Sequence, residues 1–171
     1  QAKRHLVVEL DTLGFPIVGK DPAAGGDEEN GLAFDLLSSV AENVVIGHEN
    51  GVITIDLAES DDAYREKVRA DLSEPYRTML GHFRHEVGHY YEWQLVRGDD
   101  LMARSRELFG DESKDYQAEI DRHYAEGPPE GWEQEYISTY ATMHPFEDFA
   151  ETWAHYLHIA DSVETAREFG L

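Results

Sequence analysis

The chain has 171 residues and no cysteine, and its 14 basic and 36 acidic residues give a net charge of −22 at pH 7. This charge argues against partners such as nucleic acids and anionic membrane surfaces, because both are themselves negatively charged. No apolar run is long enough to cross a bilayer, and the start does not resemble a signal peptide, so we expect no membrane association and a cytoplasmic location. The length is typical of one domain, expected to span 1–171.

The first part of the chain is expected to form a small sheet. Residues 5–10 are predicted as a strand, which residues 15–18 could continue. The acidic, glycine-rich residues 21–31 are predicted as a flexible loop and the segment most prone to disorder. Residues 32–40 fit a short strand or a short helix equally well.

A hairpin and a run of helices are expected to follow. Asn50-Gly51 is the strongest short hairpin signal, and the strands 44–48 and 52–57 flank it. Ser60 or Asp61 is expected to cap a helix that runs to about residue 72. A long helix should then cover about 75–96.

The second half is predicted to be helical. Residues 99–127 are expected to form two helices broken near Gly110, and Gly127-Pro128-Pro129 should end the second one. Another helix is predicted over 145–160, and Asp161 with Glu164 fits the capping box of a short last helix. Strands that come early and helices that come late predict the α+β class, with a small antiparallel or mixed sheet before a mostly helical region.

The most informative motif is HEVGH at residues 85–89. His85 and His89 are four apart on the predicted helix, so both can point at one ion, and imidazole nitrogens suit zinc. Glu86 lies beside them and could accept a proton from a water on that ion. The motif predicts metal-assisted hydrolysis, whereas a solvated helix face that happens to carry histidines is the alternative.

A third ligand is expected from the helix over 145–160. Its polar face carries carboxylates and imidazoles three or four apart, and by spacing alone either Glu147 or Glu151 could reach the ion. His82 lies one turn before His85 and is not needed as a ligand. Two helices with such faces predict one zinc ion per chain.

HEVGH followed by EDFAE resembles the gluzincin pattern, including the lethal-factor type with its E-x-F-A-E stretch. The resemblance implies that Glu147 is the zinc ligand and that Glu151 hydrogen-bonds a ligand histidine. It also implies that Tyr140, seven residues before Glu147, donates a hydrogen bond to the oxyanion. The strand 52–57 would be the sheet edge that pairs with an extended substrate, although a covered strand is equally compatible with the sequence.

From about residue 52 onward, the chain is similar to a bacterial family of zinc-binding metallopeptidases. The resemblance rests on four stretches: GVITIDL, EPYRTMLGHFRHEVGHYY, LFGDE and HPFEDFAETWAHYLHI. Full-length members carry a cysteine zinc ribbon before the peptidase part. This chain has no cysteine and starts at Gln1, so we expect a trimmed peptidase domain without the ribbon.

The expected function is that of a zinc metallopeptidase that hydrolyses peptide or protein substrates, with zinc on His85, His89 and Glu147 and with Glu86 as general base. The alternative is a module that binds zinc or another protein without turnover. Such a structural site would be closed by a fourth protein ligand, for which His82, Glu151 or His155 is available. The substrate preference and the oligomeric state are left open.

Overall fold

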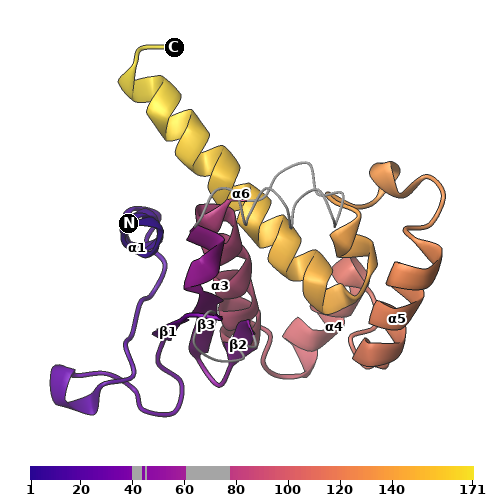
Figure 1. Ribbon diagram of the computed structural model, residues 1–171, viewed down its shortest axis with the longest axis horizontal. Coiled ribbons are helices and arrows are strands. Elements are labelled where there is room, and N and C mark those ends of the chain that lie inside the picture. The colour runs from indigo at the N-terminus through magenta and orange to yellow at the C-terminus, as the bar shows by residue number, and fades with distance from the viewer. Residues whose placement is uncertain (40–43, 45, 61–77) are drawn as a thin grey trace. The chain divides into compact units, whose positions relative to one another are not determined.

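The computed structural model describes residues 1–39, 44, 46–60 and 78–171. The chain divides into two compact units, Gln1–Tyr90 and Tyr91–Leu171, and each is described separately (Figure 1). The first unit contains a three-stranded mixed sheet, and the second is helical, so the predicted α+β class is confirmed. The helix predicted between residues 61 and 72 lies outside the described residues.

The first unit begins with helix α1, Ala2–Thr12, where a strand was predicted over 5–10. The prediction was wrong because Val7-Val8 suggested β structure, whereas the buried residues Leu6, Glu9 and Leu10 follow the helical period of three and four. Residues 15–18 are not a strand either, and only Gly19 makes an isolated bridge, to Leu32.

The acidic loop over residues 21–31 folds through hydrogen-bonded turns. Asp21 caps the short 3-10 helix η1, Pro22–Ala24, by accepting a hydrogen bond from the amide of Ala23. Asp27 accepts hydrogen bonds from the amides of Glu29 and Asn30. Short side chains that bind nearby amides therefore give this glycine-rich segment a defined path.

The sheet has the strand order β1-β3-β2, with β1 at Ala33–Leu37, β2 at Gly47–Glu49 and β3 at Val52–Asp56. β3 pairs in parallel with β1 and antiparallel with β2. The hairpin prediction is confirmed, because Asn50 and Gly51 have φ angles of 48° and 81° between β2 and β3. A Cβ on Gly51 would lie 2.2 Å from the carbonyl oxygen of Gly31, so this turn requires glycine.

The central position of β3 corrects the prediction of strand 52–57 as the substrate-binding edge. β3 has a hydrogen-bonded neighbour on each side, so its backbone groups are already used. Ile53 and Ile55 are fully buried at the period of two that is typical of a sheet facing the core.

Helix α3, Met79–Leu95, packs against this sheet. The ring of Phe83 lies 5.8 Å from that of Phe34 on β1, and the ring of Tyr90 lies 6.0 Å from that of His48 on β2. Phe83, Val87 and Tyr91, which are four residues apart, are buried, as expected for one face of a helix. The helix is continuous across the boundary between the units, so its last turns belong to the second.

The second unit contains α4 at Asp99–Phe109, α5 at Tyr116–Glu126 and α6 at Pro145–Glu168, with 3-10 turns η3 at Trp132–Gln134 and η4 at Tyr140–Thr142. The predicted break at Gly110 and the stop at Gly127 are confirmed.

The predicted short last helix is wrong, because α6 runs without interruption through Asp161 and Glu164. No glycine or proline follows Pro145 until Gly170, so nothing in the backbone stops the helix at the capping-box signal.

An aromatic column holds α6 in the second unit. Trp153 stacks on Tyr91 of α3 at 4.8 Å and on Phe149 at 6.2 Å, and Phe149 packs on Phe109 of α4 at 5.2 Å. Such ring pairs stabilise beyond the area they bury. The column fixes the last turn of α3 against the middle of α6.

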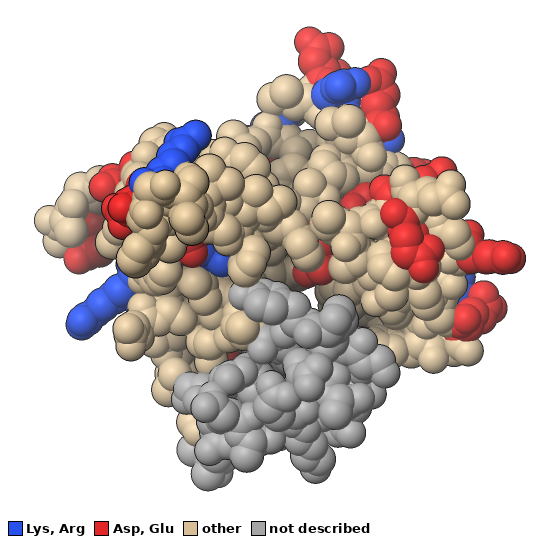
Figure 2. Space-filling view, turned by 90° about the horizontal axis from the view of Figure 1, so that it is seen from above, with Lys and Arg blue, Asp and Glu red and all other residues tan. Residues whose placement is uncertain are grey.

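The surface agrees with the acidic composition. On the face shown in Figure 2, acidic side chains are spread among neutral ones, as expected for a solvated acidic surface. Among the described residues, no helix combines the length and the apolar character needed to span a membrane.

The ion pair between Glu9 and Arg84 gives a first prediction. Arg84 is 1% exposed and donates two 3.0 Å hydrogen bonds to the carboxylate of Glu9, which is 8% exposed. Arg84→Met should lower the free energy of unfolding by about 3–5 kcal/mol, because a buried carboxylate loses its partner. Urea denaturation measures the change.

The double variant Glu9→Leu with Arg84→Met should recover most of that loss, because it removes both charges. A single variant as stable as the wild type would contradict the importance of this pair.

Candidate metal centre

His85 and His89 lie one turn apart on α3, and their Nε2 atoms are 3.1 Å from each other. The rings meet edge-on at 83°, with centroids 4.8 Å apart. Tetrahedral zinc with bonds of 2.0–2.1 Å places two ligand nitrogens about 3.3 Å apart. The predicted pair of histidines is therefore arranged as one metal ion would need it.

Glu86 is buried next to these histidines, and its two oxygens differ in their surroundings. Oε1 lies 3.3 Å from Nε2 of His82, whereas Oε2 has no hydrogen-bond partner in the described part of the chain. A buried oxygen without a partner costs free energy unless something else binds there. Oε2 of Glu86 can therefore accept a hydrogen bond from a group outside the described part of the chain.

The ionised form of Glu86 is stabilised. Burial on its own would raise the pKa of this carboxyl, but the hydrogen bond from His82 and the charges of the nearby histidines outweigh it and lower the pKa. An ionised carboxylate is the form that can accept a proton. His82, which the sequence did not require as a ligand, instead orients this carboxylate.

Glu147 lies in the first turn of α6 and is 3% exposed. His144 caps this helix by accepting a hydrogen bond from the amide of Phe146 at 3.1 Å. Tyr116, at the start of α5, donates a 2.6 Å hydrogen bond to Oε1 of Glu147. Helix cap and hydroxyl together fix where this carboxylate lies.

Glu151 lies one turn further along α6 and accepts a 2.7 Å hydrogen bond from the hydroxyl of Ser138. Nδ1 of His155 lies 2.8 Å from the carbonyl oxygen of Glu151. The two glutamates therefore have different hydrogen-bond partners. The role of Glu151 beside a ligand histidine remains a prediction.

Glu92 lies in the last turns of α3, where the charge of Glu147 influences it. Burial, together with the charges of Glu147 and Glu112, raises the pKa of Glu92 to about 8. Glu92 follows His89 by three residues, so it lies on the same helix face as the histidines. The face of α3 that carries the two histidines thus continues into a turn that carries a buried carboxyl group.

Tyr140, predicted as an oxyanion donor, lies in η4, and its ring meets that of His123 edge-on at 6.4 Å. Its role in catalysis remains a prediction.

Sequence reasoning missed His48, Glu92 and Tyr116. The imidazole of His48 on β2 accepts a 3.0 Å hydrogen bond from the amide of Gly51 at Nε2. Burial, together with the charge of His89, lowers the pKa of His48 to about 4. The HxxxHxxE spacing could have indicated Glu92, but no local signal links His48 or Tyr116 to the motif.

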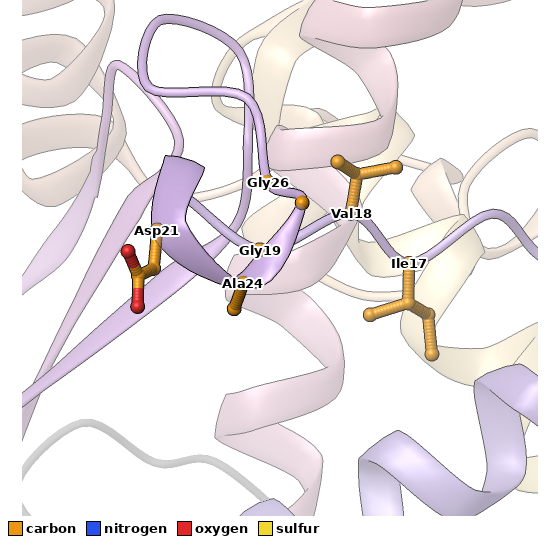
Figure 3. Close-up of a pocket in the computed structure, with 7 residues that line it drawn as sticks. Ile17, Val18, Gly19, Asp21, Ala24 and Gly26 are labelled. Atoms are coloured by element: carbon orange, nitrogen blue, oxygen red, sulfur yellow. The ribbon is translucent and has the colours of Figure 1, made fainter.

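A separate pocket lies in the N-terminal loop, away from these side chains in sequence (Figure 3). Asp21 is the titratable residue that lines it, and glycines and small or branched apolar residues form the rest: Ile17, Val18, Gly19, Ala24, Gly25 and Gly26. This lining offers few groups for acid–base or metal chemistry, so we assign it no catalytic role.

Comparison with known proteins shows the family to which the chain belongs. The chain is 57% identical to an uncharacterized protein of Mycobacterium bovis and to uncharacterized proteins of two Mycobacterium tuberculosis strains. Each comparison covers 99% of this chain but 49% of the relative, so the chain spans about half the length of these proteins. No solved structure matches it. The family described as "Putative zinc-binding metallo-peptidase" matches residues 1–171, and the chain belongs to this family, which confirms the resemblance seen in its motifs.

Proposed function

We propose that this domain is a zinc-dependent peptidase of the gluzincin type, in which His85, His89 and Glu147 bind one zinc ion. The observation that carries the proposal is that Nε2 of His85 and Nε2 of His89 lie 3.1 Å apart, as two ligands of one ion do, on the helix that also carries the buried Glu86. Glu147 is proposed as the third ligand because it is a buried glutamate at the position that the E-x-F-A-E stretch gives to the ligand.

The donor set fits zinc in a catalytic rather than a structural site. Two imidazoles and one carboxylate are the protein ligands of many zinc hydrolases, in which a fourth position stays open for water. The three side chains considered as a fourth ligand have other contacts: His82 with Glu86, Glu151 with Ser138, and His155 with the carbonyl oxygen of Glu151. These contacts favour a site that remains open.

Glu86 is the proposed general base. Its lowered pKa keeps it ionised near neutral pH, and its Oε2 atom is available to accept the proton of the attacking water. Glu86 would then pass that proton to the leaving amine. Zinc bound by these residues would supply activation of water near neutral pH and polarisation of the substrate carbonyl.

Substrate binding completes the proposal. We propose peptides or proteins as substrates and Tyr140 as the donor to the oxyanion that forms when the carbonyl is attacked. The relatives are about twice as long as this chain. The activity and the substrates of a protein of that full length are therefore also proposals.

The first test concerns the metal. Wild-type protein should contain about one zinc per chain, and His85→Ala should lose most of it, because one ligand of three is gone. Elemental mass spectrometry after extensive dialysis measures this. His158→Ala is the control, since this exposed histidine of α6 is not in the proposed ligand set and its loss should leave the zinc content unchanged. A zinc-free wild type would refute the site.

The second test separates turnover from simple metal binding. Glu86→Gln should retain zinc and lose about 100- to 10,000-fold in peptidase activity, because the amide cannot accept the proton. A proteome-derived peptide library read by mass spectrometry detects the cleavage, with the exposed Glu133→Gln as control. Equal cleavage by Glu86→Gln would rule out the assigned base, and no cleavage by wild type would favour a non-catalytic zinc module.

The third test distinguishes the two glutamates of α6. Glu147→Gln should lose zinc, whereas Glu151→Gln should still bind it, with an affinity lowered by about 10- to 100-fold at most, as expected for a residue that acts on a ligand. Competition with a chromogenic chelator measures both affinities. The opposite pattern would make Glu151 the ligand.

A further inference from the structure

The start of α5 is linked to the start of α6 through the hydroxyl group of Tyr116. This hydroxyl donates to Oε1 of Glu147 over 2.6 Å, across 31 residues of sequence. Hydrogen bonds of this length from a hydroxyl to a carboxylate are in the short, charge-assisted range. Glu147 is buried and Tyr116 is 42% exposed, so the bond links a buried carboxylate to a hydroxyl of a partly exposed side chain.

Independent contacts hold Tyr116 in place. Asp115 caps α5 by accepting a 2.9 Å hydrogen bond from the amide of Ala118, which fixes the first turn that carries Tyr116. The ring of Tyr116 packs edge-on against His144 at 5.2 Å. The hydroxyl group is therefore presented by a capped helix end.

His144 strengthens the same junction through its two ring nitrogens. Nδ1 accepts from the amide of Phe146, so the proton of the neutral ring is on Nε2, which lies 3.2 Å from the carbonyl oxygen of Lys114 and can donate to it. One imidazole thus caps α6 and holds the residues just before α5. The distance between Tyr116 and Glu147 is set by this junction.

We infer that Tyr116 is a positioning residue for the metal: its hydroxyl holds Oε1 of Glu147 and leaves Oε2 to bind the ion. The inference rests on the proposed function, because it takes Glu147 as a ligand. A donor on one oxygen favours coordination through the other oxygen alone and keeps the carboxylate from rotating. Preorganisation of this kind raises metal affinity without adding a ligand.

The test is Tyr116→Phe, which keeps the ring against His144 and removes only the hydroxyl. The affinity for zinc, measured alone by chelator competition, should fall by about 10- to 100-fold. The matched control is Tyr124→Phe on the same helix, where the tyrosine is 62% exposed and its ring lies 5.5 Å from that of His123. The control should bind zinc as the wild type does.

A second readout separates positioning from a general loss of structure. The visible absorption spectrum of the cobalt-substituted protein should change in Tyr116→Phe, since the coordination of Glu147 is no longer restricted to one oxygen. The thermal midpoint of the metal-free variant should equal that of Tyr124→Phe. Wild-type zinc affinity together with an unchanged cobalt spectrum in Tyr116→Phe would overturn the inference, as would a loss of affinity matched by a lowered metal-free midpoint.

Comparison with Glu147→Gln shows whether a negative result for Tyr116→Phe concerns the positioning role alone or the proposed zinc site as a whole. If Glu147→Gln loses zinc and Tyr116→Phe does not, only the positioning role is wrong. If Glu147→Gln binds zinc like the wild type, the ligand assignment itself is wrong, and with it the role of Tyr116.

Discussion

The candidate site depends on the fixed period of helix α3. Side chains four residues apart must share a face, so the two imidazoles of HEVGH are neighbours whatever the rest of the chain does. The opposite face, with Phe83, Val87 and Tyr91, is buried, and this burial prevents the helix from rotating. In the first unit Phe83 packs on Phe34 of the sheet, and in the second unit Tyr91 stacks on Trp153 of α6. The apolar side of the helix thus determines where its histidines point.

A second constraint is the cost of burying carboxylates in a chain of net charge −22. Glu9 is compensated by a guanidinium, and Glu86 by an imidazole. Glu147 accepts a hydroxyl hydrogen bond, whereas the pKa of Glu92 is raised to about 8, which favours its neutral form. Different surroundings thus shift the pKa values of identical side chains in opposite directions.

Most elements were predicted by local signals, and the errors have identifiable causes. The Asn50-Gly51 hairpin, the break at Gly110 and the stop at Gly127 follow from backbone preferences that act within a few residues. Helix α1 was predicted as a strand because adjacent valines outweighed a helical pattern of burial. The central position of β3 could not be predicted, because strand order depends on which distant segment pairs with each edge.

The sequence by itself determined which reactive side chains are present and how they are spaced: two histidines and a glutamate within one helical turn, and a second helix with glutamates one turn apart. It also determined membership of a zinc-binding metallopeptidase family. Tertiary structure decided which polar groups lie around these histidines and glutamates. Tyr116 reaches Glu147 across 31 residues, and His48 comes to the histidine helix through the register of a hairpin. Spacing along a helix is a local property of the backbone, whereas these partners meet only when separate elements pack, and no short-range pattern encodes that packing.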